Sequence, residues 1–433
     1  MQKTDKKVLL NNTIMMYLLS IAKLVIPLIS LPYLTNVLTK DCYGSIAFVK
    51  SIITYMQILV DFGFLLSATK DIVLLIKYGK NPNKEIGNTL YAQLILCIVA
   101  VIAMLVCCFC FDILRGYELY SFLSLLTVLL SVFLFEYVFK AYEQMGKIAI
   151  RYVLMKVLAL ILTLIFVKND GDIYLIPIFD IISSLIAVVL VIFQLKKLNV
   201  KIDFSIKRIK EGWVALRKSF VYFISNFAST AFSALNTLII GIYLSKSDVA
   251  DWSVALQIVG AVHALYTPII NSVFPTMVRT RNLKTIHKIM ALYMPLILVG
   301  CVAVWFLGDW GVNLVFGEEY INTAKILKIL IPLLIFSFPA MLYGWPCLGA
   351  INKQKMNTIS TIIGACVQTF GVICLILFGW FNIFTVSIVR SITEFVLCAM
   401  RVGVVYKNKK LFVKPPDLEN EKPDLENEKE PIS

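Results

Sequence analysis

Apolar stretches of about 20 residues recur along this chain, and short polar segments separate them. As helices that rise about 1.5 Å per residue, such stretches cross the roughly 30 Å hydrocarbon core of a bilayer. The expected transmembrane helices cover residues 12–36, 43–67, 88–111, 118–139, 149–168, 173–195, 219–244, 250–275, 287–307, 326–350, 357–379 and 382–405. The pattern therefore predicts an all-α polytopic membrane protein with about twelve transmembrane helices.

Composition agrees with this prediction, and charge adds an orientation. The 433 residues are 59% hydrophobic, with a mean hydropathy of +0.83, which excludes a soluble domain. Lysine and arginine collect in alternate connecting segments, beginning with the N-terminus, and segments of that kind face the cytoplasm. Both termini are therefore expected to be cytoplasmic. Because the net charge of +14 is spread over several segments, no nucleic-acid partner is expected.

The two halves of the chain resemble each other in the order of their loop motifs. RGYELY at 115–120 corresponds to FGEEYI at 316–321. Because each half has an even number of helices, both enter the membrane in the same orientation, as in parallel-repeat transporters. The predicted organisation is a cytoplasmic N-terminus at 1–11, an N-lobe at 12–195, a basic cytoplasmic linker at 196–218, a C-lobe at 219–405 and a disordered cytoplasmic tail at 406–433, in which PDLENEK occurs twice. We expect two six-helix lobes around a central cavity, with the linker able to contact anionic lipid headgroups.

Lys23 lies near the middle of the first predicted helix, where a charge costs about 2.5–3.5 kcal/mol on insertion scales. Such a residue usually faces a bundle interior, a water-filled cavity or an opposite charge. Pro27 removes the helical hydrogen bond that would use the carbonyl of Lys23. Pro32 does the same for the carbonyl of Leu28. We therefore predict a functional role for Lys23 and a hinge at Pro27 and Pro32.

Polar residues at helical spacing mark helices that cannot face lipid on all sides. They occur in the first two helices of each proposed half, 12–36, 43–67, 219–244 and 250–275. Equivalent helix pairs from the two halves would line the central cavity. The candidate cavity residues are Lys23, Lys50, Gln57, Asp61, Asn226, Asn236, Gln257, His263, Asn271 and Arg390.

Structural roles remain open for several of these candidates. Ion pairs with another helix explain Lys50 and Asp61 as well as substrate contact does. Arg390 and Glu394 are one helical turn apart and most simply neutralise each other. His263 is a candidate proton carrier, although a hydrogen-bonded packing histidine explains it at least as well.

Short motifs in a fixed order extend over nearly the whole chain. They are LTKDCYG at 38–44, DFGF at 61–64, FKAYEQMGKIA at 139–149, NSVFP at 271–275 and FGEEY at 316–320 followed by AKILKIL. From about residue 8 to 406, this arrangement resembles the Wzx-type polysaccharide repeat-unit flippases, the O-antigen and capsule exporters of the MOP superfamily. That superfamily also contains the MATE antiporters and the lipid II flippases.

The resemblance implies a flippase in the bacterial inner membrane that works by alternating access. Its substrate would be an undecaprenyl-diphosphate-linked oligosaccharide, moved from the cytoplasmic to the outer leaflet. Lys23, Lys50 and Arg390 would supply cations to the diphosphate, and amide and hydroxyl side chains would bind sugars. No cofactor or metal is expected, whereas coupling to the membrane potential, H⁺ or Na⁺ stays open. Membrane lipids and polysaccharide polymerase machinery are the other expected partners.

Two other functions fit the sequence less well. A MATE-like cation or drug antiporter would share the architecture, and Asp61 supports that alternative, but cation export favours carboxylates whereas the deepest candidate is Lys23. A membrane enzyme usually needs acids, bases or nucleophiles on sizeable extramembrane loops, and the outer loops here are short. We therefore expect a transporter and not an enzyme.

Overall fold

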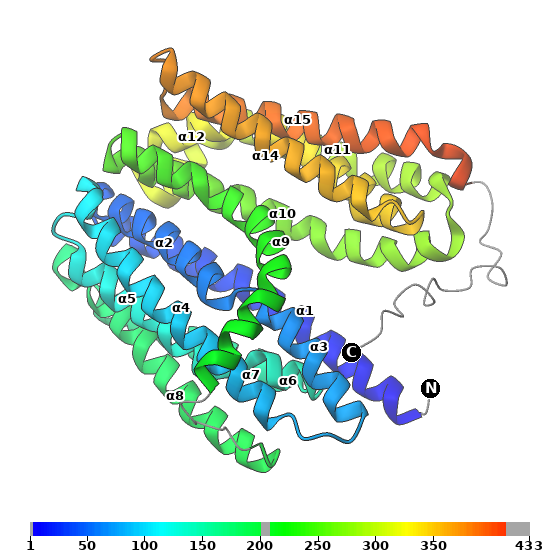
Figure 1. Ribbon diagram of the computed structural model, residues 1–433. Coiled ribbons are helices and arrows are strands. Elements are labelled where there is room, and N and C mark those ends of the chain that lie inside the picture. The colour runs from blue at the N-terminus through cyan, green and yellow to red at the C-terminus, as the bar shows by residue number, and fades with distance from the viewer. Residues whose placement is uncertain (1–2, 201–207, 413–433) are drawn as a thin grey trace. The chain divides into compact units, whose positions relative to one another are not determined.

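The computed structural model describes residues 3–200 and 208–412, and within these ranges it contains helices and no strand (Figure 1). The α-helices are α1 (Lys3–Val37), α2 (Lys40–Asp61), α3 (Phe64–Lys77), α4 (Asn83–Cys110), α5 (Glu118–Ser131), α6 (Glu136–Ala141), α7 (Met145–Phe166), α8 (Leu175–Lys197), α9 (Arg208–Tyr243), α10 (Lys246–Thr280), α11 (Leu283–Phe316), α12 (Ile321–Ile329), α13 (Ile331–Leu342), α14 (Gln354–Leu377) and α15 (Ile383–Lys407). Short 3-10 turns are η1 (Asp112–Leu114), η2 (Val132–Leu134), η3 (Asp170–Asp172), η4 (Glu318–Tyr320) and η6 (Lys409–Phe412), and η5 (Tyr343–Leu348) is a π-helical turn. Every predicted transmembrane stretch contains one of these helices, so the predicted fold class is confirmed.

The predicted tail at 406–433 and the predicted linker at 196–218 fall partly outside the described residues. So does the side chain of Asn226, although the backbone of α9 is described there.

The described helices form two compact units. The first comprises Met1–Ile258 and Asp309–Ala324, and the second comprises Val259–Gly308 and Lys325–Ser433. This grouping does not follow the predicted lobe boundary at 196–218, because α9 packs on α2, α3 and α4 within the first unit. The division into two six-helix lobes therefore stays a prediction.

The first unit is a bundle in which each long helix packs on its neighbours. Helix α1 packs on α7, α7 on α8, α8 on α5, and α5 on α2 (Figure 1). Thr39 caps the N-terminus of α2, where its side chain accepts a hydrogen bond from the backbone N–H of Cys42. In the second unit, a buried apolar core joins α13, η5 and α15 to parts of α10 and α11, and it includes Met277, Phe338 and Val405.

Helices α2 and α9 differ from the other long helices in polarity. Ten segments of the described chain are long and apolar enough to cross a membrane, and neither α2 nor α9 is among them. These two helices lie in the predicted polar-striped stretches 43–67 and 219–244. They pack against each other, and most of α2 is buried. Protein therefore covers much of the surface that lipid would otherwise contact.

The predicted helix 43–67 is not continuous, because the chain breaks at Phe62 and Gly63. Both residues have left-handed backbone angles, with φ of 41° and 76°. Glycine suits this position because it adopts positive φ without strain. A Cβ at Gly63 would also lie 2.6 Å from the Cβ of Tyr222 in α9. Helix α2 therefore ends at Asp61, and α3 begins as a separate helix.

A second break divides the predicted helix 118–139 into α5, η2 and α6. Phe135 has a φ of 46° and lies directly before the first residue of α6, Glu136. Both breaks bring a carboxylate to a helix end inside the first unit.

Gly63→Ala is expected to destabilise the protein. Alanine at a φ of 76° costs about 1 kcal/mol, and its Cβ would also collide with Tyr222. The unfolding midpoint should fall by several degrees. It is measured by heating purified protein and following the monodisperse fraction by size-exclusion chromatography. Gly311→Ala is the matched control, because no atom lies within 4 Å of its added Cβ in α11. Equal midpoints for the two variants would contradict the strained break.

Candidate functional site

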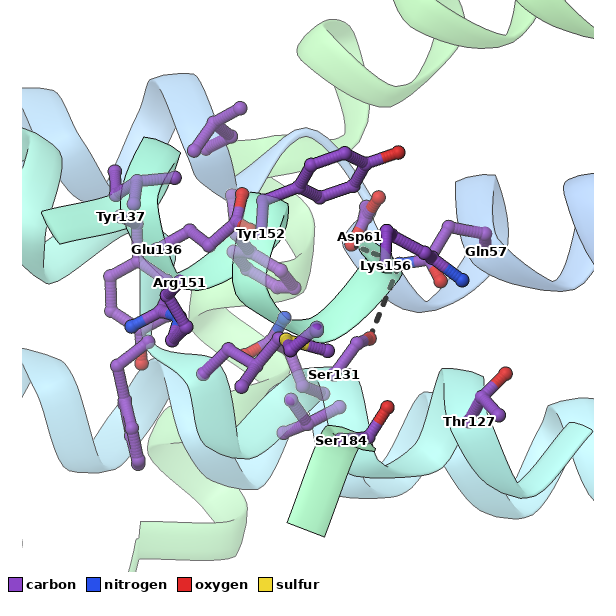
Figure 2. Close-up of a pocket in the computed structure, with 18 of the residues that line it drawn as sticks. Gln57, Asp61, Thr127, Ser131, Glu136, Tyr137, Arg151, Tyr152, Lys156 and Ser184 are labelled. Carbon is purple, nitrogen blue, oxygen red and sulfur yellow. Dashed lines mark hydrogen bonds between the residues drawn. The ribbon is translucent and has the colours of Figure 1, made fainter. Parts of the chain in front are cut away.

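A cavity of about 410 Å³ lies in the first unit, where the two helix breaks meet α7 (Figure 2). This volume falls within the range of about 300–1,000 Å³ that is typical of small-molecule sites. Its polar lining consists of Lys23, Gln57, Asp61, Gln93, Thr127, Ser131, Glu136, Tyr137, Arg151, Tyr152, Lys156 and Ser184. The cavity lies inside the predicted N-lobe, and the predicted cavity between the lobes stays a prediction.

Lys23 projects from α1 and lines this cavity. Its Nζ lies 5.3 Å from the ring centroid of Tyr152 in α7, a cation–π contact. Asp61 is close enough to attract it electrostatically, but no ion pair with Lys23 occurs among the described residues. The side chain is exposed, so its ammonium is available to a ligand.

Helix α1 continues through both of its prolines. Near them, Ser30 Oγ donates to the carbonyl of Pro27 at 3.0 Å, and Asn36 Nδ2 donates to the carbonyl of Pro32 at 2.7 Å. These bonds satisfy local carbonyls without defining a bend, so the hinge stays a prediction.

Gln57 and Asp61 are joined by a hydrogen bond at the end of α2. Gln57 Nε2 donates to Asp61 Oδ1 at 2.9 Å and is 3.2 Å from Ser131 Oγ, as the dashed lines in Figure 2 show. The break at Phe62 makes Asp61 the last residue of α2, so its carboxylate reaches the cavity wall. Within the described ranges, Asp61 forms no ion pair.

Lys156 of α7 forms an ion pair with Asp180 of α8, at an Nζ–Oδ1 distance of 2.7 Å. The two side chains are 36% and 30% exposed. The pair links neighbouring helices and neutralises the charge of Lys156 next to the cavity.

Arg151 and Gln93 are cavity residues that sequence reasoning did not select. Arg151 is near the start of α7, where a basic residue is ordinarily explained by the positive-inside pattern. Gln93 is a single amide in an otherwise apolar part of α4. Only the packing of α4 against other helices brings it to the cavity wall. No local spacing signal marks either residue.

Three other candidates lie in the first unit but do not line this cavity. The side chain of Lys50 is exposed on α2, and Asn236 of α9 is buried at 3% exposure. Gln257 Nε2 donates to the hydroxyl of Tyr43 at 3.1 Å, which connects α10 to α2. The structure thus brings together Lys23, Gln57 and Asp61 and leaves the other three apart.

The remaining described candidates belong to the second unit. His263 has a buried Nε2 without a hydrogen-bond partner in the described chain, and its ring lies 6.0 Å from that of Tyr266. Asn271 is exposed. Arg390 Nη1 is 3.2 Å from Glu394 Oε2, which is the neutralising pair expected from their spacing.

A site of this kind, polar and charged inside a multi-helix membrane protein, suits binding and passage of a polar group rather than chemistry on one. The sequence profile of the family described as "Polysaccharide biosynthesis protein" matches residues 9–281, which is more than half of the chain. The chain belongs to this family. Family membership confirms the predicted relationship to polysaccharide biosynthesis.

Two relatives match this member of the family over most of their length. A protein from Shigella dysenteriae is 25% identical over 364 residues, which cover 82% of this chain and 90% of the relative. One from Escherichia coli (strain K12) is 22% identical over 363 residues, which cover 81% and 86%. Both are named as O-antigen transporters, and neither name describes an enzyme, in agreement with the expectation of a transporter.

Solved structures of MOP-superfamily transporters have the same fold. The lipid II flippase MurJ in an inward closed conformation is 15% identical, with a TM-score of 0.66 and coverage of 92% of this chain and 89% of the other. An inward-facing MATE-family multidrug resistance transporter is 14% identical, with a TM-score of 0.61 and coverage of 90% and 98%. These similarities confirm the predicted MATE-like fold of this family member.

Asp180→Asn is expected to destabilise the protein by about 1–2 kcal/mol, because it leaves the half-buried Lys156 ammonium without its partner. Lys156→Met combined with Asp180→Asn should recover part of this loss, since the unpaired charge is then absent. Thermal unfolding midpoints of the single and double variants provide the double-mutant cycle. Strictly additive effects of the two substitutions would show that the pair contributes nothing to stability.

Proposed function

We propose that this protein is a flippase for an undecaprenyl-diphosphate-linked oligosaccharide repeat unit, used to make O-antigen or capsule. Membership of the polysaccharide biosynthesis family supports a role in that pathway, and the names of two relatives support transport. The observation that carries the proposal is the cavity in which Lys23 has no ion-pair partner within the described chain. An exposed ammonium on the wall of a polar cavity suits an anionic headgroup.

The chemistry of the cavity matches the two polar parts of this substrate. A diphosphate that leaves water needs cations and hydrogen-bond donors, which Lys23 and Gln57 can supply. Thr127, Ser131 and Ser184 offer hydroxyls for sugar groups. The polyprenyl tail is apolar, so it can stay in the bilayer while the headgroup crosses by alternating access.

The membrane potential gives this movement a direction. With the cytoplasm negative, outward movement of an anion is favoured by about 2.3 kcal/mol per charge per 100 mV. This direction of transport requires the protein to lie in the inner membrane with both termini in the cytoplasm. Coupling to H⁺ or Na⁺ would add to this effect, and no cofactor is needed.

A MATE-like antiporter is the second candidate, because Asp61 places a carboxylate in the same cavity. A cation substrate would be attracted by Asp61 and repelled by Lys23. A gene neighbourhood with glycosyltransferases and a polymerase would support the flippase, whereas a drug-export function requires no such neighbours.

Lys23→Ala is expected to reduce flipping at least about tenfold, because a charged hydrogen bond of about 1.5–3 kcal/mol is lost in the translocating complex. The measurement follows surface polysaccharide and accumulated lipid-linked repeat units in cells that depend on this protein. Lys23→Arg keeps the charge and should retain most activity.

Lys168→Ala is the matched control for this experiment. Lys168 Nζ lies 5.4 Å from the ring centroid of Tyr33, a comparable cation–π contact that is not on the cavity wall. This variant should assemble polymer normally. If Lys23→Ala also does so while present in the membrane, the proposed headgroup role is wrong.

The orientation predicts opposite results for reporter fusions at two positions. A green fluorescent protein fused after residue 412 should fluoresce and an alkaline phosphatase there should be inactive, because the reporter stays in the cytoplasm. Fusions at Glu318 in η4 should behave in the reverse way. Periplasmic activity at the C-terminal position would contradict the proposed direction of transport.

A further inference from the structure

Arg151 of α7 is a buried guanidinium group with unsatisfied donors. The residue is 3% exposed, and neither Nη1 nor Nη2 has a hydrogen-bond partner in the described chain. Its Cζ lies 5.2 Å from the ring centroid of Phe139, which covers one face of the group without accepting a hydrogen bond. Because Arg151 lines the 410 Å³ cavity, its free donors lie at the wall of that cavity.

Two other arginines in the membrane-spanning helices, Arg401 and Arg390, have partners. Arg401 of α15 donates to Ser360 Oγ at 3.1 Å, to the carbonyl of Ala340 at 2.9 Å and to Thr361 Oγ1 at 3.0 Å. Arg390 likewise pairs with a glutamate. Arg151 differs from these two arginines, because its Nη1 and Nη2 have no hydrogen-bond partner in the described chain.

An arginine side chain stays protonated in proteins, so Arg151 cannot avoid the cost of burial by losing its charge. A buried charge is strongly unfavourable unless it is paired and hydrogen-bonded. The geometry of its guanidinium, with parallel N–H groups, matches two oxygens of a phosphate or carboxylate. An oxyanion would therefore satisfy the Nη1 and Nη2 donors of Arg151.

The carboxylates near the cavity do not fill that place. Asp61 already accepts a hydrogen bond from Gln57, and Asp180 is paired with a lysine. Glu136 is a competing carboxylate, since it attracts Arg151 electrostatically and lies at the same end of the cavity in Figure 2. No ion pair joins Glu136 to Arg151 in the described part of the chain.

Gln93 provides a second unsatisfied group on the same cavity wall. It projects from α4, is 6% exposed, and its Oε1 has no hydrogen-bond partner among the described residues. Its amide can rotate so that the NH₂ group donates into the cavity. Two unsatisfied polar groups from separate helices, α4 and α7, therefore line the same cavity.

We propose that Arg151 and Gln93 form an internal subsite for the phosphoryl oxygens of the substrate's diphosphate. This inference rests on the proposed flippase function and assigns its anionic headgroup to a specific place. Arg151 holds two oxygens through its parallel N–H groups, and Gln93 donates to a third. Lys23, which is exposed, attracts the headgroup, whereas the buried Arg151 fixes its orientation.

The test measures lipid binding to the full chain in nanodiscs by native mass spectrometry. Undecaprenyl diphosphate is compared with undecaprenol, which has the same tail and no anion. The wild-type protein should prefer the diphosphate, and Arg151→Gln should reduce this preference at least about tenfold, because charged hydrogen bonds are lost. Undecaprenol binding should not change, and Arg151→Lys should retain part of the preference. Inorganic pyrophosphate should displace the lipid from the wild type if the subsite also accepts a free anion. It should fail to do so if the subsite requires the lipid-linked headgroup. In both cases, the preference for the diphosphate lipid must depend on Arg151.

Arg115→Gln is the matched arginine control. Arg115 forms an exposed ion pair with Asp112 at 2.7 Å and lies away from the cavity, so this variant should bind like the wild type.

Gln93→Glu is a second variant that keeps Arg151 in place. Its new carboxylate should pair with Arg151 and abolish the diphosphate preference. Because Arg151 then keeps a partner, a loss of preference in this variant reports on the subsite and not on unfolding.

The outcomes distinguish the subsite from the broader function. A wild-type protein that binds both lipids equally would overturn the proposed substrate class together with the subsite. A preference that persists in Arg151→Gln and Gln93→Glu would overturn the subsite alone. If Glu136 were the true partner of Arg151, Glu136→Gln would lower thermal stability as much as Arg151→Gln does, and neither would change the lipid preference. The proposed subsite instead requires Glu136→Gln to keep or strengthen diphosphate binding.

Discussion

The energetic cost of a charge inside an apolar membrane domain determines much of this structure. Basic residues avoid the cost by collecting in alternate connecting segments, as expected for helices that cross a bilayer. Some of the charges that enter the helices are paired by the fold, as with Lys156 and Asp180 or Arg390 and Glu394. A charge that remains unpaired is consequently informative. Arg151 and Lys23 meet this description in the described chain, and both line the same cavity.

The cavity itself depends on two interruptions of regular helix. The left-handed residues at Phe62 and Gly63 end α2 at Asp61, and Phe135 has the same effect before Glu136. Backbone that departs from the helix inside a membrane is tolerated where protein covers it or where it borders a cavity. In this protein the breaks do both, since Gly63 packs against α9 while its neighbours line the cavity wall.

The fold alone does not separate the functions found among similar proteins. A lipid II flippase and a multidrug transporter have comparable structures at 15% and 14% identity. Function must therefore be argued from the site. Family membership indicates polysaccharide biosynthesis, and the cations and hydroxyls on the cavity wall support the proposed anionic, sugar-bearing substrate.

The sequence by itself determined the helical membrane class, the positions of ten apolar segments long enough to cross a membrane in the described chain, and three residues of the cavity. Hydrophobic runs carry this information because each helix must match the bilayer independently of its neighbours. Lys23 was identifiable because a charge in the middle of such a run is costly wherever the helix packs. Arg151 and Gln93 were not identifiable, since one resembles an ordinary charge near a helix end and the other an isolated amide. Only tertiary packing decided that both line one cavity with polar atoms that have no partner in the described chain, because hydrogen-bond satisfaction depends on atoms contributed by other helices.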